Sequence, residues 1–277
     1  MPRPSAWDEE LLKEDTDIEM DICFASDLDY TLMHSFRYYR EGDGCVEMEG
    51  SFPRGFMSST ATSMLRDIVG LVRFVPVTTR SVEEYVRIRL LDSPPRHALV
   101  SNGGVLWVDG KYSDPDWFSC SSRLSSIAAD DFIILKDALA EYRPDKSGGL
   151  FLHGLIDGLL YCVECDEAER LYRYVQARCV FSHSRLHRTR NKVYLFPEGI
   201  TKGRSLERLR DYFKPDLIIS AGDSDIDIGM LNAADIAIVP PKLAPFVQAR
   251  RRTVYFDGDG NFEEFVLSTV LALVKAL

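Results

Sequence analysis

The chain has 277 residues, of which 45% are hydrophobic, 27% charged and 11% aromatic. This composition supports one large domain or two modest ones, and it excludes a disordered, collagen-like or disulfide-stapled protein. With 33 basic and 43 acidic residues the formal net charge is −10. Such a surface repels nucleic acid and anionic membranes, so we expect neither as a partner. A phosphate-bearing partner needs a local positive pocket or a metal ion.

The cysteines and the N-terminal residues indicate in which cellular compartment the protein is expected. The six cysteines are scattered along the chain, which is typical of a reduced, cytoplasmic protein. Only Cys162 and Cys165 form a C-x-x-C, and no second pair completes a zinc site. Residues 2–17 are acidic and lack the apolar region of a signal peptide, and no apolar stretch approaches the roughly 18 residues of a membrane span. We therefore expect a cytoplasmic protein.

Strands and helices alternate over the first hundred residues and again after about residue 200. The predicted elements of these two parts are strands at 20–27, 71–79, 96–104, 215–223 and 234–240, an edge strand at 252–257, and helices at 60–70, 81–91, 201–213 and 261–277. Short apolar runs alternating with helical patterns are typical of a parallel sheet covered by helices. We therefore expect residues 1–112 and 198–277 to form a Rossmann-like α/β core.

The pattern changes between residues 113 and 197. The predicted elements there are a helix at 126–142, strands at 150–156 and 159–165, a helix at 166–179, and strands at 182–188 and 192–197. Asp157-Gly158 between the first two strands is a strong hairpin signal. The segment is thus two copies of one αββ unit. We expect it to form an inserted α+β (αββαββ) domain.

Three strand ends carry polar groups, and in an open parallel sheet ligands gather beyond the carboxyl ends of the strands. These groups are Asp27 and Asp29 in SDLDYT, Thr78 and Arg80 in VTTRS, and Asp223, Asp225 and Asp227 in GDSDID. Converging carboxylates repel one another unless a cation lies among them, and Mg²⁺ prefers oxygen ligands. Lys202, at the start of a predicted helix, supplies a fixed positive charge.

An acidic crevice with one cation and one lysine suits phosphoryl transfer. One carboxylate attacks phosphorus and forms an aspartyl-phosphate, which water later opens. A second carboxylate, two residues further on, protonates the leaving alkoxide and then activates the water.

The motifs DLDYT, VTTR, ITKG and GDSDID occur in the order of the four motifs of the haloacid dehalogenase (HAD) superfamily of phosphatases, which they resemble. The αββαββ segment and the SNGG turn at 101–104 are similar to the cap and the preceding turn of its Cof-like, sucrose-phosphate-phosphatase-like branch. The resemblance covers residues 20–277. It implies a HAD core in which residues 113–197 form the cap domain that selects the substrate.

The resemblance also implies roles for the motif residues. Asp27 would be the nucleophile, and Asp29 the general acid and base. Thr78 would hydrogen-bond the transferring phosphoryl group, and Lys202 would hold Asp27 and the phosphate. The implied Mg²⁺ ligands are Asp27, Asp29 through its backbone carbonyl, Asp223, and Asp227 either directly or as an anchor of the metal's waters.

Tyr30 and Thr79 stand where the family usually has glycine, and two further features depart from the family pattern. Ile226 stands where the branch usually has an asparagine beside the metal. The Mg²⁺ shell is therefore left open, with Ser224, Asp225 or Asp227 as compensating groups. The segment 33–58 is longer than the usual loop after the first motif, and we interpret it as an extra hairpin at the rim of the active site.

The candidate substrate contacts come from two turns and from the cap: Thr79, Arg80, Asn102, Gly103, Arg188 and Arg190. Each has an alternative. Arg80 could instead cap the following helix, and Asn102 could order the SNGG turn. The basic cluster at 185–192 is either a solvated sheet edge or a source of one or two side chains that bind an acidic or polyhydroxylated substrate.

We therefore expect a Mg²⁺-dependent phosphomonoester hydrolase acting on a small phosphorylated metabolite, with a sugar phosphate as the expected class. Two alternatives stay open: a sugar phosphomutase of the same fold, and a catalytically idle metabolite-binding protein. The sequence specifies neither the physiological substrate nor the oligomeric state.

Overall fold

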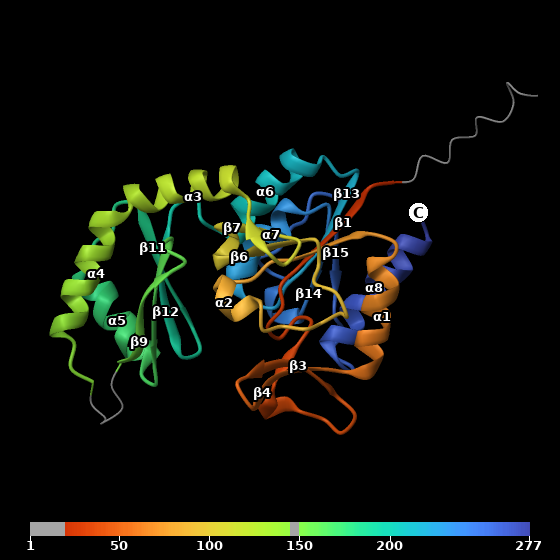
Figure 1. Cartoon of the computed structure of the whole chain (residues 1–277), viewed down its shortest axis with the longest axis horizontal. Helices are drawn as coiled ribbons and strands as arrows, with labels where there is room; N and C mark the ends of the chain where they lie inside the picture. The colour runs from red at the N-terminus through yellow and green to blue at the C-terminus, as the bar shows by residue number, and fades with distance from the viewer. Residues whose placement is uncertain (1–19, 145–149) are drawn as a thin grey trace, which may run out of the picture.

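A computed structural model describes residues 20–144 and 150–277. Its centre is a five-stranded parallel sheet in the order β15-β14-β13-β1-β5 (Figure 1). The strands are β1 (Ile22–Ser26), β5 (Arg73–Pro76), β13 (Leu217–Ala221), β14 (Ile236–Val239) and β15 (Arg252–Tyr255). They confirm the predicted parallel α/β sheet, with β15 at one edge. The expectation that residues 1–19 belong to the core concerns a segment outside the described residues.

Helices cover both faces of this sheet. One face packs against α1 (Ser59–Val69) and α8 (Phe262–Lys275), and the other against α6 (Lys202–Phe213) and α7 (Ile228–Ala233). Phe24 of β1 packs with the first pair of helices, and its neighbour Cys23 packs with the second. Every residue of β1 is buried as a result, which explains its almost uninterrupted apolar sequence.

Two predicted elements of the first hundred residues are wrong in part. The helix expected at 81–91 is a single turn, α2 (Val82–Tyr85). The chain leaves it because Ile88 pairs with Glu47 of a hairpin, and the Arg89 N–H donates to the Val46 carbonyl at 2.6 Å. This pairing outweighs the helical pattern.

The run at 96–104 forms β6 (His97–Val100), which turns back after a 3₁₀ turn (Ser101–Gly103). It pairs with β7 (Val105–Val108), and β7 with β8 (Tyr112–Ser113), in a separate antiparallel sheet. A parallel bridge between Val77 and Leu99 places β6 beside the end of β5. The run is therefore a strand, but it does not extend the central ladder.

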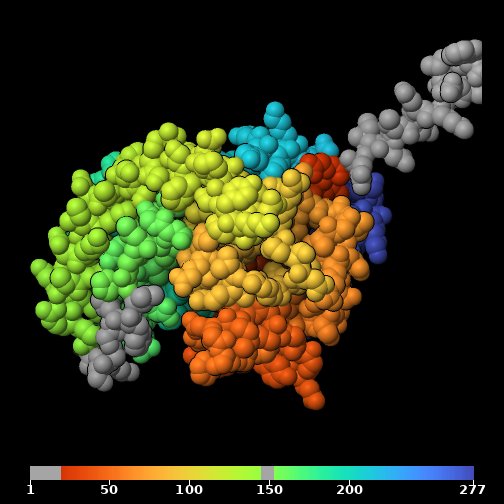
Figure 2. All heavy atoms as spheres, in the orientation of Figure 1, coloured from red at the N-terminus to blue at the C-terminus, as the bar shows by residue number. Residues whose placement is uncertain are grey.

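The segment after β1 forms the extra hairpin that its length predicts. Its elements are β2 (His34–Ser35), a 3₁₀ turn (Phe36–Tyr38), β3 (Gly44–Glu49) and β4 (Phe52–Met57), in the sheet order β2-β4-β3. In Figure 1 the β3–β4 hairpin lies at the lower edge of the core. Figure 2 shows it in orange-red, directly against the amber segment that follows α2.

From α4 onward the inserted segment has the predicted αββαββ order. Its elements are α3 (Pro115–Ile127), α4 (Ala129–Glu141), β9 (Leu150–Ile156), β10 (Leu160–Cys165), α5 (Ala168–Arg178), β11 (Ser184–Thr189) and β12 (Lys192–Pro197). The strands form an antiparallel sheet in the order β11-β12-β10-β9. Helix α3 was not predicted. Asp157 and Gly158 both adopt left-handed backbone conformations in the β9–β10 turn, as a tight Asp-Gly hairpin requires.

The two faces of this smaller sheet have different partners. Helices α4 and α5 cover one face, where Leu135 and Leu171 pack with Val163 and Val193. Residues of the other face, among them Tyr194, join the main core cluster. The smaller sheet thus lies between its own helices and the parallel-sheet core, at the left of Figure 1. In the part of the chain that the structure describes, no helix has the length and apolar character to cross a bilayer.

Candidate active site

The sequence motifs meet where the central strands end. Asp27 follows β1, and Asp223 follows its neighbour β13 after one intervening glycine. The two strands are in register from Ile22 to Ser26, and the Asp27 N–H donates to the Ala221 carbonyl at 3.0 Å. Because parallel neighbours end at the same edge, carboxylates far apart in sequence converge there.

A lysine holds the carboxylate of Asp27. The Nζ atom of Lys202, the first residue of α6, lies 2.5 Å from Asp27 Oδ1 and 2.6 Å from Asp227 Oδ1. Thr31 donates its hydroxyl to Asp27 Oδ2 at 3.1 Å. Burial lowers the pKa of Lys202, but the two carboxylates outweigh burial and raise that pKa above its usual value. Lys202 is therefore a permanent ammonium group.

Asp227 orders the loop after β13. Its Oδ2 accepts from the backbone N–H groups of Asp223 and Ser224, at 3.1 and 2.9 Å, and from the Ser224 hydroxyl at 2.8 Å. Asp227 is completely buried. Gly222 makes this packing possible, because a Cβ atom there would lie 2.5 Å from the Cβ of Asp227.

The donor set fits a hard divalent cation. Carboxylate oxygens of Asp27, Asp223 and Asp227 lie within 4.8 Å of one another. Burial raises the pKa of Asp27, with Lys202 opposing and the neighbouring carboxylates adding to the rise. Burial also raises the pKa of Asp223, against the effect of Lys242. Crowded, desolvated carboxylates of this kind are relieved by a cation, and all-oxygen sites suit Mg²⁺.

The position of Ile226 bears on this site. Ile226 lines the same cavity as Asp27, Asp223 and Ser224. Asp225 lies outside the carboxylate cluster, is 64% exposed, and has an oxygen 3.4 Å from Nε2 of His187. Of the three groups considered as substitutes for the missing asparagine, Asp227 alone belongs to the cluster.

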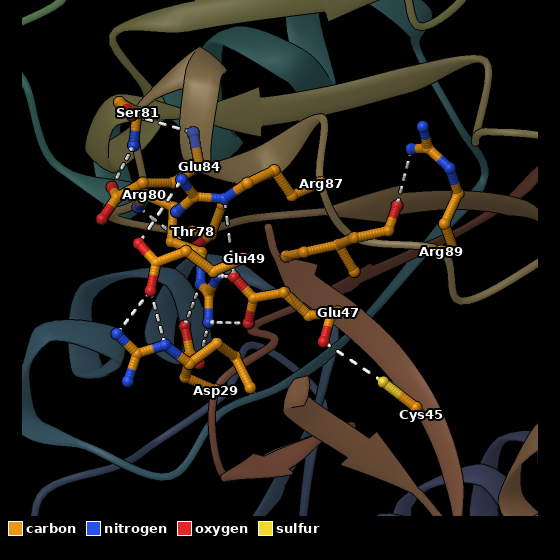
Figure 3. A network of polar contacts seen from close by, with 12 residues as sticks. Asp29, Cys45, Glu47, Glu49, Thr78, Arg80, Ser81, Glu84, Arg87 and Arg89 are labelled. Atoms are coloured by element: carbon orange, nitrogen blue, oxygen red, sulfur yellow. Dashed lines mark hydrogen bonds and ion pairs between the residues drawn. The ribbon is translucent and has the colours of Figure 1, made fainter. Parts of the chain in front are cut away.

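Arg80 lies between two carboxylates (Figure 3). Its Nε and Nη2 donate to the two oxygens of Asp29, both at 2.8 Å. Its Nη1 and Nη2 donate to the two oxygens of Glu47, at 2.5 and 3.0 Å. Burial would raise the pKa of Asp29, but Arg80 outweighs it and lowers that pKa. The alternative role of Arg80 as a helix cap is wrong, since Ser81 and Glu84 form the capping box of α2.

The two threonines of the second motif are placed differently. Thr78 is 1% exposed, and its Oγ1 accepts the Arg80 N–H at 3.2 Å. Thr79 lines the cavity beside Asp27, whereas Thr78 is not among the lining residues. The hydroxyl of Thr78 thus supports the turn that carries Arg80, and Thr79 faces the space available to a ligand.

Asn102 and Gly103 have structural contacts in the SNGG turn. Asn102 adopts a left-handed conformation and donates its side-chain N–H to the Ile200 carbonyl at 2.9 Å. At Gly103, a Cβ atom would lie 1.9 Å from Oγ of Ser205. Neither residue lines the cavity that contains Asp27. The geometry therefore favours the alternative weighed for Asn102, that it orders the turn.

The basic cluster of the inserted domain divides between two sides of its sheet. Arg188 donates to Glu169 of α5 at 2.7 Å and does not line the cavity. Arg190, in the β11–β12 turn, lies over the ring of Tyr30, 3.2 Å from the guanidinium carbon to the ring centre. Lys192 also faces the core, with Nζ 3.4 Å from Glu84. Of the two candidate arginines, Arg190 alone adjoins the cavity.

These parts enclose a cavity of about 410 Å³. Asp27, Lys202 and Asp223 belong to its floor, and the hairpin, the segment around α2 and the inserted domain supply the other walls. The lining side chains from these walls include Glu47, Glu49, Arg54, Arg80, Glu84, Arg87, Glu164, Arg190, Asn191, Lys192 and Tyr194. Charges of both signs alternate around the space, so it suits a small polar ligand.

Sequence reasoning missed two residues of this site. Thr31 holds Asp27, and its place four residues after Asp27 within DLDYT is a signal that could have identified it. Glu47 holds Arg80 but lies in a segment with no recognisable motif. Its position became evident only with the fold of the hairpin.

No protein-family model matches the sequence, and no curated protein matches it. Solved structures do match. A HAD superfamily phosphatase of Bacteroides thetaiotaomicron is 15% identical, with 95% of this chain and 98% of that chain covered at a TM-score of 0.55. The sucrose-phosphatase of Synechocystis, solved with sucrose and phosphate, is 13% identical over 92% and 98% at 0.55. A trehalose-6-phosphate phosphatase related protein is 13% identical over 93% and 100% at 0.51.

These comparisons cover nearly the whole of each chain. They confirm that the protein has the fold of the HAD phosphatases, a parallel-sheet α/β core with an inserted cap, as the four motifs and the αββαββ segment predicted.

Proposed function

We propose that the protein is a Mg²⁺-dependent phosphomonoester hydrolase that acts on a small phosphorylated metabolite. The observation that carries this proposal is the buried Asp27 carboxylate, held 2.5 Å from Lys202 at the floor of a polar cavity. Phosphoryl transfer requires such a fixed nucleophile and a preorganised positive charge.

The reaction proceeds in two displacements. An oxygen of Asp27 attacks phosphorus, and the bond between phosphorus and the ester oxygen breaks as Asp29 gives that oxygen a proton. Asp29 then removes a proton from water, the water oxygen attacks phosphorus, and the bond to Asp27 breaks, which releases phosphate. Lys202 stabilises the charge on the phosphoryl oxygens throughout. Thr79, at the cavity wall, contributes a hydroxyl to the same group.

Asp27, Asp223 and the backbone carbonyl of Asp29 are the proposed Mg²⁺ ligands, with Asp227 as a further ligand or as the anchor of the metal's waters. The bound cation neutralises charge on the phosphoryl group. The close approach of the three carboxylates supports this assignment.

Residues 113–197 act in this proposal as a cap that excludes bulk water and selects the leaving group. Among the contacts that join it to the core are those of Asp157, Arg190 and Lys192. Asp157 accepts from the Val82 N–H at 2.9 Å and from the Ser101 hydroxyl. Arg190 stacks on Tyr30, and Lys192 adjoins Glu84 at 3.4 Å.

A sugar phosphate is the proposed substrate class. The mixed charges of the cavity wall suit a leaving group with several hydroxyls, and similar solved structures include a sucrose-phosphatase with sucrose and phosphate. Arg190 is the proposed contact from the cap, and a cytoplasmic location accords with a soluble metabolite as substrate.

The test is a product analysis. A panel of sugar, acid and nucleotide phosphates is incubated with the protein and Mg²⁺, and phosphate and isomerised esters are both measured. Free phosphate from at least one ester supports the hydrolase. Isomerised ester without free phosphate would indicate a phosphomutase. The absence of any product from every ester would indicate a protein that binds a metabolite without converting it.

A further inference from the structure

Glu47 is a buried carboxylate that belongs to none of the sequence motifs. It lies on β3 of the hairpin, and its side chain is 4% exposed. Glu49, two residues further along the same strand, has a side chain that is 45% exposed. Residues two apart on a regular strand share one face, and both glutamates line the cavity, with Glu47 the more deeply buried of the two.

Two features of the hairpin turn Glu47 inward. The pairing of β3 with β4 shifts register on both sides of Glu47, and such bulges redirect side chains. Its partner across the ladder is Gly55, where a Cβ atom would lie 3.1 Å from the Cβ of Glu47 and 2.6 Å from the Cε of Met33. The glycine leaves the space that the inward carboxylate needs.

The outer edge of β3 is also fixed. Glu47 forms an antiparallel bridge with Ile88, and the Val46 carbonyl accepts the Arg89 N–H at 2.6 Å. Figure 3 shows β3 and the segment after α2 holding the charged side chains between them. The hairpin is therefore hydrogen-bonded to the segment that follows α2 at the wall of the active site.

The carboxylate of Glu47 accepts the hydrogen bonds of Arg80 that are not directed at Asp29 alone. The guanidinium uses Nε and Nη2 for Asp29, and Nη1 and Nη2 for Glu47. These contacts fix the plane of the guanidinium, which has five N–H donors in a rigid fork. Without Glu47, Nη1 loses its partner, and the guanidinium can rotate away from Asp29 toward an anionic substrate.

We propose that Glu47 is a positioning residue for leaving-group protonation: it holds Arg80, and Arg80 holds the Asp29 carboxylate in place. This inference rests on the proposed hydrolase function and adds to it a residue from the hairpin. Its consequence is specific, because protonation matters for alkoxide leaving groups and hardly at all for a nitrophenolate, which departs as a stable anion.

The test compares two leaving groups in one variant. Glu47→Gln keeps the size of the side chain and removes its charge. We expect it to lower kcat for the best alkyl phosphate of the panel about 10-fold or more, a part of the 10²–10⁴ that general acid catalysis supplies. The kcat for p-nitrophenyl phosphate should change less than about 3-fold. Glu47→Asp, which keeps the charge, should recover part of the loss.

Glu41→Gln is the matched control, since Glu41 is exposed in the loop before β3 and does not line the cavity. It should leave both substrates unaffected. In an Arg80→Gln background, Glu47→Gln should have no further effect, because the path through Arg80 is already broken. Thermal unfolding of each variant checks that the hairpin still folds.

Equal losses on both substrates, or no loss on either, would overturn the proposal, and so would an undiminished effect of Glu47→Gln in the Arg80→Gln background. A wild-type protein that hydrolyses neither ester is a different result: it removes the hydrolase function itself, and the role of Glu47 with it.

Discussion

Lys202 Nζ lies 2.5 Å from Asp27 Oδ1, although the two residues are 175 positions apart. Both side chains are almost completely buried, at 2% and 8% exposure. A pair so deeply buried is strongly destabilising to break from one side, because the remaining charge has no partner. The contact therefore links the stability of the core to the chemistry proposed for it.

Lys202→Ala should affect both properties. We expect kcat to fall by about 10² or more, comparable to the loss of one preorganised charge-stabilising donor. The free energy of unfolding should fall by about 3–5 kcal/mol, since Asp27 and Asp227 lose their shared cation. Steady-state kinetics and urea unfolding measure the two effects. If the variant merely raises KM, Lys202 contributes uniform binding and not transition-state stabilisation.

The Mg²⁺ shell can be tested at Ile226. Ile226→Asn restores the amide that the Cof-like branch usually has beside the metal, at a side chain that already lines the cavity. We expect tighter Mg²⁺ binding, seen as activation at lower Mg²⁺ concentration. An unchanged Mg²⁺ titration would show that the existing carboxylates complete the shell without this position.

The two cap arginines should behave differently. Arg190→Ala removes a side chain at the cavity and should raise KM about 10-fold, roughly the loss of one charge-assisted contact. Arg188→Ala removes a side chain that pairs with Glu169 on the other side of the sheet. It should leave kcat/KM within about 2-fold of wild type, as expected for a partly exposed ion pair. The opposite ranking would contradict the assignment of Arg190 to the substrate site.

The stability of the cap should depend on pH through Asp131. Buried Asp131 accepts from the Ser182 and His183 N–H groups, at 3.0 and 2.8 Å. Burial would raise the pKa of Asp131, but these hydrogen bonds outweigh it and lower that pKa. The stabilisation is therefore present above the unfolded value of about 3.9 and is lost as pH falls through the lower folded value.

Asp131→Asn should lower the free energy of unfolding at pH 7 by about 1–2 kcal/mol. The difference from wild type should shrink as pH falls below about 3.9, where the carboxyl is protonated first in the unfolded state, and further as pH falls through the lower folded value. Urea unfolding at the two pH values measures it. Asp130→Asn, at the exposed neighbouring position, serves as the control and should show no such dependence.

The floor of the site could be predicted from the sequence because strand direction determines it. Once β1 and β13 are parallel neighbours, the residues after Ser26 and Ala221 must meet, and Asp27 and Asp223 follow from that. The αββαββ order of the cap was equally predictable, since its strands are short and the first two are separated by the turn residues Asp157 and Gly158.

The walls of the cavity could not be predicted from the sequence, because they depend on where side chains point in strands whose pairing is irregular. Strict alternation predicts that neighbouring residues of a strand face opposite sides, but Val46 and Glu47 are both buried where the pairing of the hairpin shifts register. The helix expected at 81–91 ends early for a related reason: Ile88 pairs with this same hairpin. The sequence pattern of residues 81–91 gives no information about this pairing, because Glu47 lies about 40 residues earlier in the chain.

The most direct measurement is phosphate release from the best ester of the panel by wild-type protein and by Asp27→Asn, each with Mg²⁺ and with EDTA. Asn keeps the size of the side chain but is not a nucleophile, and circular dichroism confirms that the variant is folded. The account predicts release by the wild-type protein with Mg²⁺ and none in the other three arms. Release by folded Asp27→Asn near the wild-type rate, or undiminished release in EDTA, would contradict it.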